Sequence, residues 1–123
     1  MKARTPKSLL SAVAVSCILA GTALAHHGWT GYDEKQTLTL TGTIRESGYE
    51  NPHGFVRLEV AGDKAKTWLV VLAPPSRMET RGLPREALKT GATATVVGYP
   101  ERTKPDELRA ERITIAGKTT ELR

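Results

Sequence analysis

Three histidines are the residues of this chain best suited to hold a metal ion: His26, His27 and His53. Cleavage after Ala25 would make His26 the first residue, and its free α-amine and ring Nδ1 could then chelate one ion together. One further imidazole would complete three nitrogen donors in a T-shaped or tetragonal arrangement, the histidine brace, which suits Cu(II). We therefore expect copper to bind through His26 and His53, with His27 as an alternative or additional donor.

Other reactive groups are few in this sequence. Cys17 is the only cysteine and lies in the segment that cleavage would remove, so we expect no disulfide, thiolate metal site or cysteine nucleophile. After cleavage, Met78 is the only methionine. The chain contains no phosphate-binding loop, nucleophile elbow or HExxH pattern. These residues favour an oxidised metal held by nitrogen, and metal storage or delivery rather than an enzyme.

Residues 1–25 have the three parts of a cleavable secretory signal peptide. Basic residues come first, and the apolar run 9–21 is shorter than the roughly 20 residues that span a bilayer. Ala23 and Ala25 then supply the small side chains that signal peptidase requires. We expect a periplasmic protein that begins at His26 and has no membrane span in its mature form. An uncleaved signal anchor is the alternative.

Removal of this segment changes the charge of the chain. It takes away three basic residues and no acidic ones, which lowers the net charge from +5 to +2. The high net charge therefore belongs partly to the signal, and we expect no nucleic-acid partner. Residues 26–123 are enough for one small domain with one core, beginning with an N-terminal arm over 26–36.

The elements that must position the histidines are mostly strands. Apolar residues alternate with threonines through TLTLTGTIRE at 37–46, which predicts a half-buried strand with a bulge or bend at Gly42. A second alternating strand is predicted over 55–60, followed by a hairpin connection at 61–64. The run 68–73 is apolar on both faces, which is typical of a central strand.

A short helix is predicted after the third strand. Ser76 and Glu79 have the spacing of a capping box, in which the serine caps the helix and the glutamate reaches back to it. Gly82 is expected to end this helix, and 84–89 to add another turn or two. Two more strands are predicted, over 93–99 and 111–115.

This order of elements predicts a mainly β fold, a small five-stranded OB-like barrel with one short helix between strands 3 and 4. A β-sandwich fragment or split meander is the competing topology. The residues after Gly117 and Lys118 are expected to form a polar tail, and the first strand to pair with the second. The predicted shared core consists of Leu38, Leu40, Ile44, Val56, Leu58, Trp68, Val70 and Val96.

Aromatic and charged residues lie near the histidines in the sequence. We expect Trp29 and Tyr32 to pin the arm onto the core, although these rings and Tyr49 could instead shield a site or stack on a sugar. Asp33 and Glu34 could orient a ligating imidazole or simply be solvated. Six arginines are expected to lie on a solvated, mixed surface rather than on an anion-binding face: Arg77, Arg81, Arg85, Arg102, Arg109 and Arg112.

Several short motifs together carry a resemblance to a known family. They are His26-His27-Gly28-Trp29, Tyr32-Asp33, Leu40-Thr41-Gly42-Thr43, Asn51-Pro52-His53, Arg81-Gly82, Leu88-Lys89-Thr90-Gly91 and Val97-Gly98-Tyr99-Pro100. With them the chain resembles a family of small proteobacterial exported proteins of unknown function. The sequence departs from that family at Gly28, where serine is expected, and at Gly48-Tyr49-Glu50, where a tryptophan often precedes Asn-Pro-His. The resemblance implies an exported β domain and supplies no function.

The sequence leaves three functions open. The first is an exported copper-binding protein that uses His26, His27 and His53, with a periplasmic protein as a candidate partner. The second is a metal-free OB-like module that binds or assembles a peptide, glycan or envelope partner. The third is a small oxidative copper enzyme, which would need a substrate surface that the sequence does not identify.

Overall fold

The computed structural model describes residues 3, 28–62 and 65–123. The predicted signal peptide, apart from Ala3, lies outside the described residues, and so do His26 and His27. Residues 63–64 of the expected hairpin connection also lie outside them. In the part of the chain that the structure describes, no helix has the length and apolar character needed to cross a membrane.

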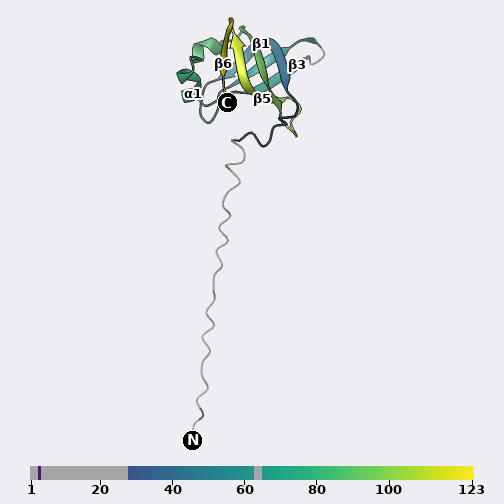
Figure 1. Cartoon of the computed structure of the whole chain (residues 1–123), viewed down its shortest axis with the longest axis vertical. Helices are drawn as coiled ribbons and strands as arrows, with labels where there is room; N and C mark the ends of the chain where they lie inside the picture. Colours follow the sequence, from purple (N-terminus) through teal and green to yellow (C-terminus); the bar gives the residue numbers. More distant parts are fainter. Residues whose placement is uncertain (1–2, 4–27, 63–64) are drawn as a thin grey trace.

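The described chain forms strands with two short helical turns between the third and the fourth strand (Figure 1). The elements in order are β1 (Leu38–Gly48), β2 (Phe55–Val60), β3 (Lys66–Val71), α1 (Pro75–Thr80), the 3-10 turn η3 (Arg85–Leu88), β4 (Thr93–Pro100), β5 (Glu107–Ile115) and β6 (Lys118–Glu121).

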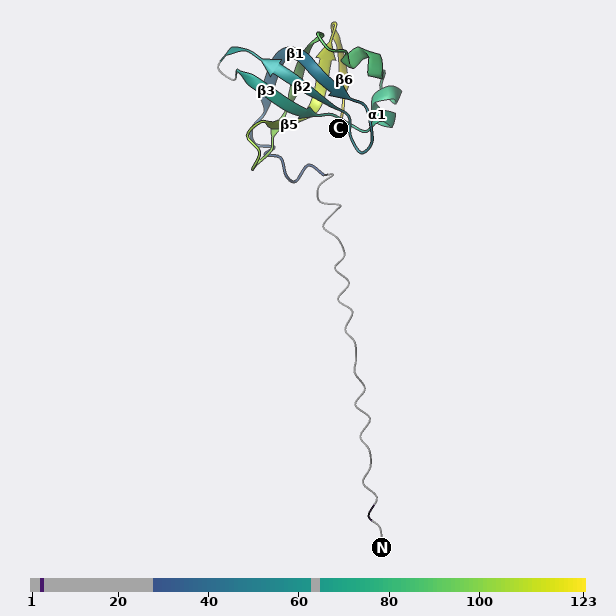
Figure 2. The ribbon, with the colours of Figure 1, turned by 180° about the vertical axis from the view of Figure 1, so that it is seen from behind.

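The strands close into a five-stranded barrel, which confirms the predicted OB-like fold. Antiparallel pairs join β1 to β2, β2 to β3, β1 to β4 and β4 to β5. A short parallel pairing of β3 with β5, from Leu69 opposite Glu107 to Val71 opposite Arg109, completes the ring. Closure removes the exposed strand edges that would otherwise attract other chains. Seen from both sides, α1 lies beside the barrel near β6 and away from β3 (Figure 2).

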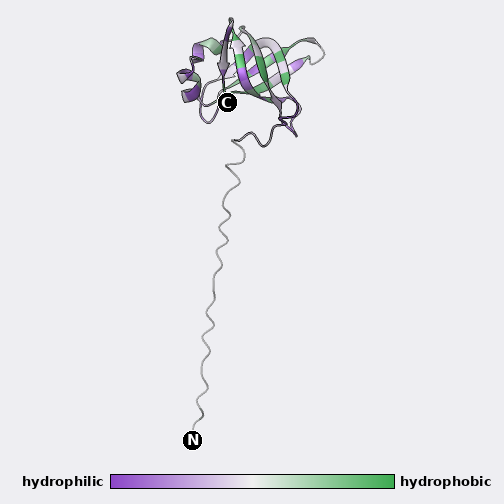
Figure 3. Cartoon of the chain, in the orientation of Figure 1, coloured by the Kyte–Doolittle hydropathy of each residue, from purple (hydrophilic) through white to green (hydrophobic). Residues whose placement is uncertain are grey.

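The core fills the barrel with the alternate side chains of each strand. Ile44 lies opposite Leu58 in the β1–β2 register, and both are fully buried, as the predicted register requires. Seven of the eight predicted core residues are in this cluster, and the eighth, Leu38, is partly buried and packs against it. Figure 3 shows the apolar positions gathered on the strands and hydrophilic residues over much of α1.

The expected polar tail is instead a strand, β6, paired with β5. Ala116 and Gly117 both have positive φ, which makes the two-residue turn that suits a tight hairpin. Thr114 and Thr119 share a hydroxyl hydrogen bond of 2.7 Å across the pair, and Leu122 just beyond the strand is buried. The prediction was wrong because the strand is stabilised by cross-strand polar pairs, which hydropathy alternation does not detect.

The predicted capping box is also absent. The helix α1 begins at Pro75, and its N-cap, Pro74, lies two residues before the expected cap Ser76 and provides no side-chain cap. Proline at the first helical position needs no donor there and has its φ already fixed, so it starts the helix without the serine. Ser76 instead accepts a hydrogen bond from Thr80 through its backbone oxygen. Gly82 ends the helix as predicted, with a φ of +82°.

Gly98 lets β4 and β5 approach closely at an irregularity in their register. A Cβ at this position would collide with the backbone oxygen of Arg109 and the Cα of Ala110. Both clashing atoms belong to main chain held in the barrel, so neither can move away cheaply. Glycine at this point therefore fixes how far Arg109 stands from β4.

Gly98→Ala is expected to lower the free energy of unfolding by about 2–3 kcal/mol, the usual cost of forcing an extra carbon into a packed core. Gly31→Ala is the matched control, because a Cβ there meets only a side-chain atom of Glu101 at an ordinary 3.5 Å. Urea denaturation of both variants measures the difference. Equal stability of the two would contradict the close approach.

Candidate functional site

Arg109, on β5, links the N-terminal arm to the turn before β2. Its side chain is only 4% exposed. Nη1 donates to the backbone oxygen of Gly28 at 2.9 Å, and Nη2 lies 3.3 Å from Nε2 of His53. One guanidinium thus binds both the backbone carbonyl of Gly28, the residue after His27, and the imidazole of His53.

Trp29 packs between positive charges beside this link. The guanidinium carbons of Arg109 and Arg123 each lie 4.5 Å from the centre of its ring, within the range of cation–π attraction. Tyr99 approaches the same indole edge-on, with ring centres 6.0 Å apart. The half-buried indole is therefore fixed by contacts to three other side chains.

Tyr32 anchors the next part of the arm and is 8% exposed. Its hydroxyl donates to Oε2 of Glu107 at 2.7 Å. Burial, and then the Glu107 carboxylate, raises the pKa of Tyr32 well above its ordinary value, so the phenol stays protonated and donates. The backbone N–H of Asp33 adds a hydrogen bond of 2.8 Å to Pro100 on β4. These contacts confirm that Trp29 and Tyr32 pin the arm.

His53 is half-buried just before β2, and the backbone beside it is fixed. Gly54 donates to Ala73 and accepts from Leu72 at 2.9 and 2.8 Å. Because a guanidinium can only donate, the contact with Arg109 makes Nε2 of His53 the acceptor and puts the ring proton on Nδ1. The imidazole is then neutral, which is the form that binds metals.

The predicted metal ligands are only partly described. His53 lies beside the carbonyl of Gly28, while His26 and His27 lie outside the described residues. Among residues 3, 28–62 and 65–123, no group of three or more His, Cys, Asp or Glu side chains is placed to hold an ion. The described residues therefore contribute one candidate donor, His53, and an anchor for the chain that carries the others.

The two acidic residues of the arm, Asp33 and Glu34, contact residues other than His53. Asp33 accepts hydrogen bonds from Lys35 and Gln36 within the arm. Glu34 forms an ion pair with Arg123. Neither contact orients His53.

Tyr49 is buried, and its hydroxyl donates to the backbone oxygen of Leu83 at 2.5 Å. Burial raises the pKa of this phenol, with smaller contributions from Glu79 and Glu86. The ring therefore fixes the segment between α1 and η3 rather than shielding a site.

Arg109 is the residue that the sequence reasoning misplaced, because it was grouped with solvated arginines. Burial lowers its pKa from the ordinary value, although a guanidinium stays protonated in proteins. Its chain neighbours Leu108 and Ala110 are both fully buried, and a charge is rarely buried without partners. The local sequence did not mark this burial, because Glu107 and Glu111 flank the three residues.

Comparison with known proteins places the chain in a family. Residues 14–108 match the Family of unknown function (DUF6152), a range that contains the positions of all three histidines, and the chain belongs to this family. No curated protein sequence matches the chain. Among solved structures, it is similar to a chain in the crystal structure of a complex of TiaS with a transfer RNA and ATP, with 19% identity and a TM-score of 0.49. The match covers 75% of this chain and 20% of that one.

Arg109→Met is expected to loosen the arm, because it removes the donor to Gly28 and the cation over Trp29. We expect the amide protons of Tyr32 and Asp33 to exchange with solvent about tenfold faster, and stability to fall by about 1–3 kcal/mol. Hydrogen exchange followed by NMR measures both effects. Arg45→Met, which removes only an exposed ion pair with Glu59, is the control. Unchanged protection of the arm would show that Arg109 does not hold it.

Proposed function

We propose that the mature chain is a periplasmic protein that binds Cu(II) for storage or delivery. The amine and ring of His26 and the imidazole of His53 supply the donors, and His27 is an alternative or additional one. The observation that carries this proposal is the shared guanidinium of Arg109, which binds both the Gly28 carbonyl and the His53 ring.

The length of chain between the anchor and the proposed ligands supports this arrangement. His27 directly precedes Gly28, and His26 is one residue further away. Successive Cα atoms are about 3.8 Å apart, so both residues begin within two such steps of the anchored carbonyl. This length of chain is short enough to bring the donors of His26 and the His53 ring to one ion, with metal–nitrogen bonds of about 2 Å.

Copper binding would break the present contact between Arg109 and His53. If the ion binds Nε2, it takes the lone pair that now accepts from Arg109. If it binds Nδ1 of a neutral ring, the ring proton moves to Nε2, which then cannot accept from Arg109. The ion and Nη2 thus compete for one imidazole, while Nη1 can stay on Gly28.

This competition favours delivery over permanent retention. The guanidinium is a fixed positive charge close to the proposed ion and lowers its affinity by repulsion. Release of the ion would let Arg109 return to His53, so the emptied ring is not left without a partner. The nitrogen donors and the absence of cysteine from the segment 26–123 favour Cu(II) over Cu(I).

The N-terminal residue of the exported protein tests the first requirement. Cleavage after Ala25 is expected, because Ala23 and Ala25 fit the peptidase. Mass spectrometry of the protein purified from the periplasm should find a chain beginning at His26. A chain beginning at Leu24, or one that retains the signal, would remove the amine chelate and contradict this proposal.

Cu(II) titration of correctly processed protein tests the ligands. His53→Ala and the addition of three alanines before His26 are each expected to weaken binding by about tenfold or more, because each removes a donor. Three alanines are used because one or two would place a histidine third from the amine, where it forms a different copper chelate. Three alanines after Arg123 are the matched control. Equal affinity in all proteins would favour the metal-free binding module instead.

The same titration should show weaker binding as the pH falls. Protons compete with copper for the imidazoles, whose ordinary pKa is about 6.5, and for the α-amine, at about 7.7–8.0. Affinity should therefore decline steadily from pH 8 to pH 5.5. Affinity that does not change over this range would exclude these donors.

A further inference from the structure

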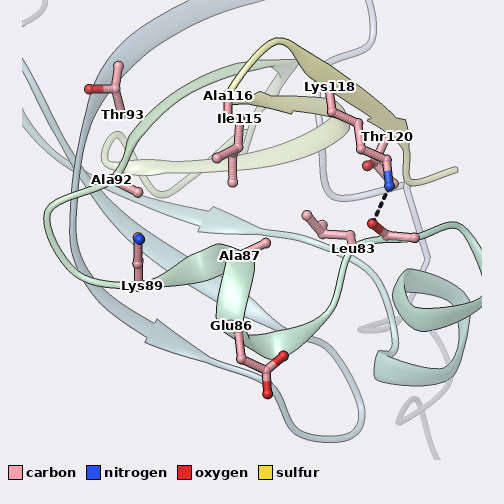
Figure 4. Close-up of a pocket in the computed structure, with 11 residues that line it drawn as sticks. Leu83, Glu86, Ala87, Lys89, Ala92, Thr93, Ile115, Ala116, Lys118 and Thr120 are labelled. Atoms are coloured by element: carbon pink, nitrogen blue, oxygen red, sulfur yellow. Dashed lines mark hydrogen bonds between the residues drawn. The ribbon is translucent and has the colours of Figure 1, made fainter.

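A second candidate site lies on another part of the barrel, between η3 and the β5–β6 hairpin (Figure 4). It is a pocket of about 630 Å³, within the range of small-molecule sites in proteins. Leu83, Ala87, Ala92 and Ile115 form much of its lining. None of the residues that line it is aromatic, so its walls suit an aliphatic chain better than a ring that would stack.

Thr120 gives this pocket an unusual polar group. The side chain is 3% exposed, and among the described residues its hydroxyl has no hydrogen-bond partner. A buried hydroxyl without a partner costs free energy, and such groups are rare in folded proteins. The neighbouring residue, Thr119, lies on the other face of the hairpin, and its hydroxyl does have a partner in the hydroxyl of Thr114. Thr120 lines the pocket and is suited to a polar group of a ligand there.

The charges at the pocket favour an anion. Lys118 is two residues before Thr120 on β6, so their side chains lie on the same face of the strand. Its ammonium donates to the backbone oxygen of Gly82 at 2.5 Å, which leaves two further N–H donors. Lys89 adds a second positive charge to the lining, whereas the carboxylate of Glu86 points away from β5 and β6 in Figure 4.

We propose that this pocket binds a free aliphatic monocarboxylate. The hydrocarbon chain lies against Leu83, Ala87 and Ile115, and the carboxylate accepts hydrogen bonds from Lys118 and from the Thr120 hydroxyl. Because that hydroxyl is covered by its neighbours, binding requires side chains of the lining to shift and uncover it. The site shares none of these residues with the proposed copper site, and it does not depend on that proposal.

Sodium octanoate, titrated into the ¹⁵N-labelled processed protein, tests the pocket, with 1-octanol as the uncharged probe. Saturable NMR shifts are expected at Leu83, Ala87 and Lys118, with octanol bound at least about tenfold more weakly. Lys118→Met should weaken octanoate binding by about tenfold, while Lys104→Met, an exposed lysine outside the pocket, should not.

Two further variants keep the test independent of folding defects. Thr120→Val has nearly the same shape, so we expect it to fold, to raise the Tm without ligand and to weaken octanoate severalfold. Ala87→Phe should fill the pocket and abolish the shifts. His53→Ala should bind octanoate normally, which separates this proposal from the copper site.

Three results would overturn the proposal. The first is equal affinity for octanoate and octanol together with no effect of Thr120→Val, which would describe an unspecific apolar surface. The second is a set of shifts centred on residues outside the pocket. The third is concentration-dependent shifts of the pocket residues without octanoate, which would show that a second copy of the chain covers them.

Discussion

The buried guanidinium of Arg109 is the interaction on which the arrangement of the candidate site depends. A charge that is 4% exposed needs partners, and it obtains them from the N-terminal arm and from the turn before β2. The arm is held because its carbonyl and indole satisfy that charge. Segments that are far apart in the sequence therefore meet at one side chain, and the barrel fixes where that side chain stands.

The barrel fixes Arg109 from two directions. The parallel pairing of β3 with β5 includes Arg109 itself, opposite Val71. On the other side, Gly98 allows β4 to lie almost against the backbone of Arg109. The position of the Arg109 backbone is thus set by main-chain contacts of the barrel, and the arm and His53 meet the guanidinium that it carries. A site built on such a scaffold keeps its geometry when surface residues vary.

The fold was largely predictable from the sequence, because alternation in β1 and β2 and the apolar run of β3 report burial directly. Leu40, Ile44 and Leu58 lie in the core as that alternation requires. The strand β6 could not be predicted in this way, since threonine pairing and a tight turn stabilise it without an apolar pattern. The start of α1 was misplaced because Pro75 begins the helix without the side-chain cap that was expected from Ser76.

The candidate site was predictable only in part. Residue type identified His53, and Trp29 and Tyr32 were correctly expected to pin the arm. Arg109 was missed because the partners that justify its burial come from Gly28 and Trp29, more than seventy-five residues earlier in the chain. A pattern read from neighbouring residues of the sequence cannot reveal a contact between residues so far apart. Leu108 and Ala110 flank Arg109, but Glu107 and Glu111 lie beyond them, so the local pattern did not show that this part of β5 is buried.

Closure of the barrel also has a consequence for the order in which the molecule assembles. The β3–β5 pairing joins residues 69–71 to 107–109, and such long-range pairings form slowly because a long loop must first close. Arg109 is on β5, the last of the five ring strands along the sequence, so the N-terminal arm lacks this partner until β5 has joined the ring. The meeting of the arm with His53 is therefore a property of the finished barrel, and ligands that need both would be acquired after folding rather than during it.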